Sequence, residues 1–373
     1  MYITYQISTQ QLPQPCTQLT FEQLLAGIRP EIPVNLPRPV HGYNPRTISI
    51  AAHQLTPQFI RNTEQNKTHF VNETQEIWER YSDKEMSQFY AHFEIPKASG
   101  GTRPIDAPTE QLKADLRKLN KELRNAGVHA HTAAYAYVPT RCHKNAMERH
   151  QRTGHTNYLH LDLKNFFGSC TIPFMKMQLR QIPFFEFLGD NYLTKILHMS
   201  TLHDVLPQGS PLSPWLTNQV MLPIDFELAK FCETHAITYT RYADDMIFSA
   251  NFNPKTAILG ALSVLLENTP LRINEEKTHN TTINGRNWNL GLMINQENKI
   301  SVGYKKKEII RARLTNFCNN HETWSCKDAQ EFLGVYQYNA GIEPDYFQSL
   351  LTKYNNKYNM DILATLKNII KTR

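Results

Sequence analysis

The chain has 373 residues, 40% of them hydrophobic, which is long enough for several packed units. Its net charge of +6, from 40 lysines and arginines against 34 aspartates and glutamates, suits a phosphate-rich partner without establishing one. The six cysteines form no C-x-x-C pair, which argues against a zinc ribbon or a redox motif.

The sequence also argues against secretion and membrane insertion. The first residues lack a basic segment ahead of an apolar core. No apolar run approaches the ~20 residues of a membrane span. Together with scattered cysteines, this favours a cytoplasmic protein without a membrane partner.

Residues 1–70 are rich in proline and poor in charge. Proline at this density disfavours long helices and central strands. We expect an extended N-terminal arm, with short helices such as Phe21 to Ala26, that wraps another part of the protein or a partner. A disordered tail is the alternative.

Two helices are predicted next, over 74–92 and over 109–125. The second has a leucine stripe from Leu112 to Leu123 and a basic opposite face. A solvated surface and contact with nucleic-acid phosphates both fit that face. Its basic residues are Lys113, Arg117, Lys118, Lys121 and Arg124. Ala133 to Pro139 predicts a loop or short strand before a further helix.

A strand is predicted at Tyr158–Leu163, because Leu159, Leu161 and Leu163 alternate along it. We expect this strand to be half-buried, with Asp162 on the face opposite the leucines. A turn residue at the strand end is the alternative reading of Asp162.

Arg241 to Asp245 holds two adjacent acids between strand-like segments, which predicts a hairpin with Asp244 and Asp245 at its tip. Carboxylate oxygens are preferred ligands of Mg²⁺. If Asp162 ends a neighbouring strand, the three acids can hold two metal ions ~3.5–4 Å apart for nucleotidyl transfer. A solvated turn is the alternative for the acid pair taken alone.

The remaining elements are helical. An amphipathic helix is predicted over 255–267. Four more helices are predicted over 305–317, 328–338, 345–354 and 361–370. The first of these carries a second basic cluster, which consists of Lys305, Lys306, Lys307, Arg311 and Arg313.

Six blocks of sequence, in this order, resemble those of reverse transcriptases. They are Phe93 to Pro108, Asp162 to Phe167, Leu206 to Asn218, Tyr242 to Asp245, Ile273 to Thr278 and Leu290 to Leu292. The resemblance covers roughly residues 85–310 and implies an α+β right-hand polymerase fold. It implies an arm at 1–70, fingers at 71–160, a palm at 161–302 with part of the fingers inserted, and a helical thumb at 303–373. The palm is expected to be an antiparallel sheet with packed helices.

The resemblance also implies a metal site. Asp162 and Asp244 are expected as the main ligands, with Asp245 completing the acidic cluster and the backbone carbonyl of Leu163 contributing. All three acids count as catalytic residues. The implied cofactors are two Mg²⁺ ions, with Mn²⁺ as a substitute.

Further roles follow from the same resemblance. Lys97 and Arg103 are expected to neutralise the triphosphate of a dNTP, for which Arg is suited by its bidentate geometry. Phe167 is expected to exclude a ribose 2′-OH, and Gln208 to face the nascent base pair. Lys277 is expected to contact the triphosphate or protonate pyrophosphate, with a solvated lysine as the alternative. Nucleic-acid contacts are assigned to Lys113, Arg117, Lys121, Gly291, Lys305, Lys306 and Arg311.

Within the family, the chain is most similar to compact bacterial enzymes of the retron and defence-associated, group II intron-like kind. Lys144 to His150 is close to the retron Asn-Ala-x-x-His motif, although one residue longer. Of the retron Val-Thr-Gly motif only Gly291 is present. We expect no RNase H domain, because the chain ends near the predicted thumb.

We therefore expect an RNA-directed DNA polymerase that copies a dedicated structured non-coding RNA in antiphage defence. Its partners would be that RNA, the RNA/DNA duplex and dNTPs, with a homo-oligomer or an effector protein left open. The alternatives are a template-independent or protein-primed polymerase of an abortive-infection system, a mobile-element enzyme and an RNA-binding scaffold.

Overall fold

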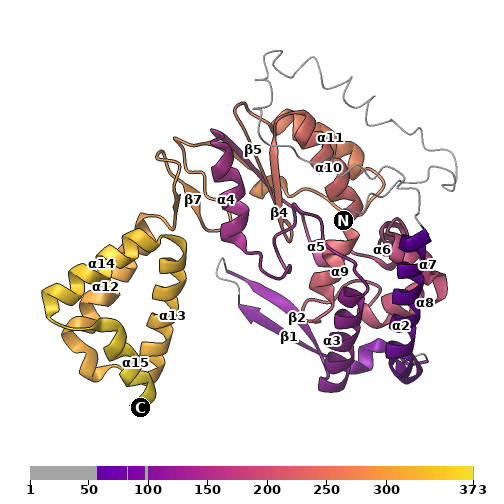
Figure 1. The fold of residues 1–373 in the computed structure, drawn as a ribbon, viewed down its shortest axis with the longest axis horizontal. Coiled ribbons are helices and arrows are strands. Elements are labelled where there is room, and N and C mark those ends of the chain that lie inside the picture. Colours follow the sequence, from indigo (N-terminus) through magenta and orange to yellow (C-terminus); the bar gives the residue numbers. More distant parts are fainter. Residues whose placement is uncertain (1–56, 82, 97–99, 373) are drawn as a thin grey trace. The chain divides into compact units, whose positions relative to one another are not determined.

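The computed structural model describes residues 57–81, 83–96 and 100–372 (Figure 1). Most of the predicted N-terminal arm and Lys97 therefore lie outside the described residues. The chain forms two compact units, one up to Cys142 together with Leu159–Asn280, the other His143–Tyr158 together with Thr281–Arg373. The boundaries of these units do not coincide with the predicted boundaries of fingers, palm and thumb. That division into three domains stays a prediction.

The described part of the first unit begins with α2 (Pro57–Tyr81), a helix longer at its start than the predicted 74–92. Proline is tolerated in the first helical turn, so Pro57 does not prevent it. The prediction was also wrong about the helix end. Residues past Tyr81 form a short 3₁₀ helix, η2 (Met86–Phe89), and the strand β1 (Tyr90–Pro96), which pairs with β2 (Thr102–Pro108). Strand pairing overrides the local helical spacing here.

The predicted second helix is confirmed as α3 (Glu110–Asn125), with Thr109 as its N-cap. The Thr109 side chain accepts from the backbone N–H of Leu112, which satisfies one of the unpaired donors of the first turn. The leucine stripe is fully buried and packs against α2. The amphipathic pattern alone therefore located this helix correctly.

A four-stranded sheet, most of which belongs to the first unit, has the strand order β4-β5-β3-β6. Its strands are β3 (Asn157–Asp162), β4 (Thr238–Tyr242), β5 (Asp245–Ala250) and β6 (His279–Thr282). Strands β4 and β5 form the predicted hairpin. The prediction of a half-buried β3 was wrong, because His160 and Asp162 are buried as well as the leucines. The segment around η3 (Glu275–Lys277) covers that second face.

Six further helices between Phe166 and Thr234 were not predicted. They are α5 (Phe166–Ser169), α6 (Ile172–Leu179), α7 (Pro183–Leu188), α8 (Asp190–Ser200), α9 (Ser213–Val220) and α10 (Leu222–Thr234). Most are short, and α9 is buried on nearly all sides, so its sequence carries no one-sided apolar stripe. Helix α11 (Lys255–Leu265) confirms the helix predicted over 255–267. Helix α10 packs against α11 and against β4.

The second unit contains α4 (His143–Thr153), a small hairpin of β7 (Met293–Ile294) and β8 (Ile300–Ser301), and four C-terminal helices. Helix α4 packs against the hairpin. The four helices confirm the predicted pattern as α12 (Tyr304–Asn320), α13 (Cys326–Ile342), α14 (Pro344–Tyr358) and α15 (Ile362–Thr372), with the 3₁₀ helix η4 (His321–Thr323) after the first. Among the described residues, no helix is long and apolar enough to cross a membrane.

Candidate active site

The three predicted acids meet at one end of the central sheet. Tyr242 pairs with Asp245, so Ala243 and Asp244 form a two-residue turn at the hairpin tip. The backbone N–H of Leu163, next to Asp162, donates to the Asp244 carbonyl at 3.0 Å. The end of β3 is thereby joined to the hairpin tip, as the sequence predicted.

Asp162 is held by two side chains from the segment after α11. Its Oδ1 pairs with Lys277 Nζ at 2.7 Å, and its Oδ2 accepts from Asn274 Nδ2 at 3.2 Å. The backbone N–H of Asn274 also donates to the Asp162 carbonyl at 2.8 Å. Asp162 is only 5% exposed, so these contacts fix the direction of a nearly buried carboxylate.

Asp245 has a partner that sequence reasoning missed. His160 Nε2 lies 2.8 Å from Asp245 Oδ1, and the His160 ring stacks on His279 with ring centres 4.6 Å apart. His160 precedes Asp162 by two residues, so both side chains leave the same face of β3. That alternation is the signal that could have identified His160, once β3 was known to pair with β5.

The electrostatics of the cluster are those of crowded negative charge. Desolvation raises the pKa of Asp244, and the carboxylates of Asp245 and Asp162 raise it further, while Lys277 opposes them. The hydrogen bond to Asp162 raises the pKa of Lys277. The site therefore favours an added cation near Asp244.

The donor atoms suit a hard divalent metal, because carboxylate oxygens are its usual ligands. Desolvation is the largest cause of the raised pKa of Asp244, and a cation would offset the smaller contribution of the neighbouring carboxylates. Within the described ranges, however, no three His, Cys, Asp or Glu side chains converge as a metal-binding group. Lys277 instead neutralises Asp162, and His160 engages Asp245.

Besides Lys277 on η3, the described nucleotide-binding residues that we predicted in the first unit lie on α5, on β2 and in the loop before α9. Phe167, at the start of α5, is partly buried with its ring edge-on to Phe166, 6.0 Å between centres. The Gln208 carbonyl accepts from the Asp106 N–H at 2.8 Å, which ties the loop before α9 to β2. Arg103 is exposed on β2.

The predicted phosphate contacts fall on both units. On α3, Lys113 lies 3.1 Å from Glu110 and Lys121 lies 3.9 Å from Glu122, whereas Arg117 is exposed. These residues recur every four positions, so they form one stripe along the helix.

In the second unit, Lys306 Nζ donates to the Gly291 carbonyl at 3.0 Å. Gly291 has a φ of 73°, which glycine adopts without strain. Lys305 is exposed at the start of α12, and Arg311 lies over the Tyr304 ring, 5.4 Å from its centre.

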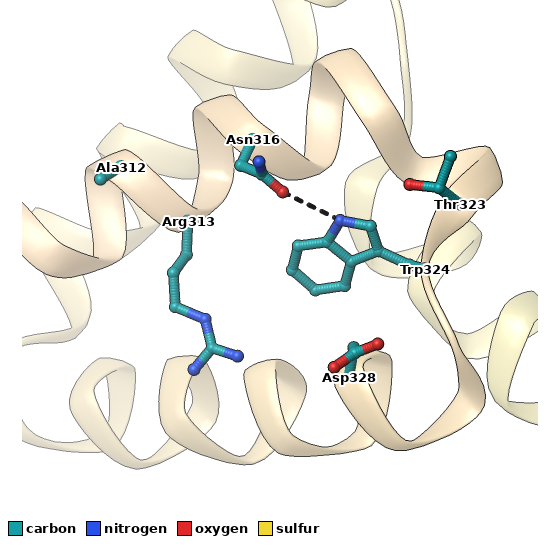
Figure 2. Close-up of a pocket in the computed structure, with 6 residues that line it drawn as sticks. All are labelled: Ala312, Arg313, Asn316, Thr323, Trp324 and Asp328. Carbon is teal, nitrogen blue, oxygen red and sulfur yellow. Dashed lines mark hydrogen bonds between the residues drawn. The ribbon is translucent and has the colours of Figure 1, made fainter.

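The second unit also has an open hollow between α12 and α13, shown in Figure 2. Trp324 Nε1 donates to Asn316 Oδ1 at 3.1 Å, and Arg313 pairs with Glu331. Asp328 forms a capping box with Ser325. Since these polar groups already bind one another, the hollow is a weaker candidate than the acid cluster.

Comparisons with known proteins identify a family. Residues 95–336 match the family described as reverse transcriptase (RNA-dependent DNA polymerase). The chain is 29% identical over 301 residues to the retron Ec83 reverse transcriptase of Escherichia coli, a match that covers 76% of this chain and 90% of that protein. It is 30% identical over 251 residues to the retron Mx65 reverse transcriptase of Myxococcus xanthus, covering 62% of this chain and 56% of that protein.

Among solved structures, the apo telomerase of Candida tropicalis aligns with 13% identity and a TM-score of 0.44. That match covers 80% of this chain and 65% of the telomerase chain. Similarity at this level is too low to support an inference about function.

Proposed function

The chain belongs to the reverse transcriptase family and is an RNA-directed DNA polymerase, and we propose that Asp162, Asp244 and Asp245 carry its chemistry. The observation behind this proposal is the backbone hydrogen bond between Leu163 and Asp244, which joins the end of β3, where Asp162 lies, to the hairpin tip that carries the other two acids. In-line nucleotidyl transfer needs such a concentration of negative charge, because the carboxylates bind the metal ions that contact the triphosphate.

Asp162 and Asp244, with the backbone carbonyl of Leu163, would hold two Mg²⁺ ions, for which Mn²⁺ can substitute. Asp245 contributes charge while it stays bonded to His160. When bound, the metal would activate the attacking oxygen and neutralise the leaving one. Lys277 keeps its side chain 61% exposed while it pairs with Asp162, so its ammonium group can meet the triphosphate.

Nucleotide selection is assigned to residues around the acids. Arg103 and Lys97 neutralise the triphosphate, and Gln208 faces the nascent base pair. The ring of Phe167 excludes a ribose 2′-OH, which directs the enzyme toward dNTPs. The contact between Gln208 and Asp106 supports this assignment, because it fixes the selecting loop against the strand that carries Arg103.

Template and primer phosphates bind the basic residues of the two units. In the first unit these are Lys113, Arg117 and Lys121. In the second they are Lys305, Lys306 and Arg311, together with the turn at Gly291. Their charge supports binding to any nucleic acid and does not select a sequence.

The template is a dedicated structured non-coding RNA, and its copying serves antiphage defence. This part rests on the relatives, which are retron reverse transcriptases. It is an analogy within the family and is not argued from particular residues of this chain.

The template assignment is tested by sequencing the RNA and DNA that co-purify with the wild-type protein and with Asp244→Ala. One abundant structured RNA is expected with both proteins, and complementary DNA with the wild type alone. A broad mixture of cellular RNA would contradict a dedicated template and favour a mobile-element enzyme.

A further inference from the structure

A fully buried ion pair joins β4, one strand of the hairpin that carries Asp244, to α10. Arg241, on β4, donates from Nε and Nη2 to Asp225 of α10 at 2.9 and 2.6 Å. The Tyr239 hydroxyl donates to the same carboxylate at 2.7 Å. Arg241 and Asp225 are both 0% exposed, so the pair is screened from solvent entirely.

The remaining arm of the guanidinium reaches the hairpin turn. Arg241 Nη1 donates to the Ala243 carbonyl at 3.1 Å. Ala243 has a φ of 59°, a conformation that a two-residue turn usually gives to glycine. A non-glycine residue persists in such a conformation only where its surroundings hold it there. The Arg241 bond is a contact of that kind.

The backbone around the turn is fixed on both sides. The N–H of Arg241 donates to the Ala133 carbonyl at 2.7 Å, and the Arg241 carbonyl accepts from Tyr135 at 2.8 Å. On the other side of the turn, Leu163 donates to the Asp244 carbonyl. The two peptide groups on either side of the Asp244 Cα are therefore each held by a separate element.

A buried ion pair is a costly way to fill a core. Removing both charges from water is unfavourable, and well-packed apolar residues of similar size serve stability as well or better. An apolar pair, however, has no donor for the Ala243 carbonyl. The contact with the turn is thus the property that distinguishes Arg241 and Asp225 from an apolar core.

We propose that the Asp225–Arg241 pair is a positioning device that holds the Ala243 carbonyl and so sets the direction of the Asp244 carboxylate. Asp225 orients the guanidinium from α10, and Arg241 transmits that position to the turn. The inference rests on the proposed function, since it concerns the same acids. Groups that orient metal-binding side chains typically contribute 10–100-fold to metal affinity or activity.

The test replaces both partners with apolar residues, Asp225→Leu with Arg241→Met, so that no unpaired charge remains buried. We expect kcat for RNA-templated DNA synthesis to fall by about 10- to 100-fold and the Mg²⁺ concentration for half-maximal rate to rise by a similar factor. The KM for dNTP should change little. All values are taken at a temperature where circular dichroism shows every protein folded.

The first unit provides a matched control. Asp115 of α3 accepts from Arg80 Nη1 at 2.5 Å and from the Tyr81 hydroxyl at 2.8 Å, so the same three residue types meet away from the hairpin. Asp115→Leu with Arg80→Met should leave kcat and the Mg²⁺ requirement of the folded protein unchanged. A merely structural role for Asp225 and Arg241 predicts the same result for both double variants.

Wild-type kcat and Mg²⁺ requirement in the Asp225→Leu/Arg241→Met protein would overturn the inference. If that protein does not fold, Arg241→Lys replaces it, because lysine keeps a cation beside Asp225 and lacks the forked donors; the same two readouts decide. Asp244→Ala separates this failure from failure of the proposed function. If Asp244→Ala still synthesises DNA, the proposed function is wrong, whereas its inactivity beside a fully active double variant rejects the positioning role alone.

Discussion

Phe167 is the residue on which the choice of sugar depends in this account. Its ring is partly buried, edge-on to Phe166, and it follows Asp162 by five positions in the chain. Phe167→Ala removes the ring and the collision with a ribose 2′-OH. We predict that ribonucleotide incorporation relative to dNTP incorporation rises by about 10- to 100-fold, measured by single-nucleotide primer extension.

The dNTP rate of the same variant serves as the control for Phe167→Ala, because smaller steric bulk should leave it near the wild-type value. Unchanged sugar selectivity together with a normal dNTP rate would assign the exclusion to another residue.

His150 couples the stability of the second unit to pH. It is 0% exposed, and desolvation lowers its pKa to about 3. In the unfolded chain the pKa returns to ~6.5, so the unfolded state takes up a proton first as the pH falls. The contribution of His150 to stability is present in full well above pH ~6.5, and it is lost as the pH falls toward 3, by about 2 kcal/mol between pH 7.5 and 5.

Urea unfolding of wild type and His150→Gln at pH 7.5 and pH 5 measures this contribution. The wild type should lose about 2 kcal/mol more than the variant over this interval. Equal losses in the two proteins would show that other groups govern the acid sensitivity. The burial also means that His150, the last residue of the retron-like motif, acts as a core residue of α4.

The loop before α9 lies so close to β2 that Gly209 has no room for a side chain. A Cβ on Gly209 would lie 2.5 Å from the Asp106 carbonyl oxygen, and the φ of 132° is unfavourable for other residues. Gly209→Ala should therefore separate the loop from β2 and lower the free energy of unfolding by about 1–3 kcal/mol. The KM for dNTP should rise, because Gln208 and Arg103 lose their common anchor.

Gly334→Ala is the matched control, because a Cβ at this position in α13 meets nothing within 4 Å. Thermal unfolding should show this protein unchanged or more stable, by up to about 1 kcal/mol. A Gly209→Ala protein as stable and as active as Gly334→Ala would contradict the described packing of the loop.

Elements whose sequence carries a complete local pattern could be predicted. The leucine stripe located α3, and the paired acids between apolar segments located the β4–β5 hairpin. Helices such as α9 could not be predicted by this route, because burial on nearly all sides leaves no periodic contrast. The end of α2 was misplaced because pairing with β2, a long-range interaction, draws Tyr90–Pro96 into a strand.

The residues of the candidate site also divide into those that could be predicted from the sequence and those that could not. The three acids follow from motif and strand order, since both are properties of short segments. His160 and Asp225 could not be assigned, because their roles depend on which strand neighbours β3 and on where α10 packs. Arg241 was visible in the motif, but its contact with Ala243 is a property of the folded turn alone.

At the scale of the whole molecule, the proposed chemistry and part of the proposed nucleic-acid binding belong to different compact units. The three acids, Phe167 and Gln208 lie in the first unit, whereas Gly291 and the basic residues of α12 lie in the second. Loss of an acid should therefore abolish synthesis while RNA binding is retained, because the basic residues are untouched.

The most direct measurement is primer extension on an RNA template with Mg²⁺, using wild type, Asp162→Asn and Asp244→Asn. Filter binding of the same template, run in parallel, reports RNA affinity. The account predicts DNA synthesis by the wild type, a loss of at least about 10³-fold in both variants, and RNA affinity within twofold of wild type in all three. Synthesis by either variant at a rate near that of the wild type would contradict the assignment of the chemistry to this acid cluster.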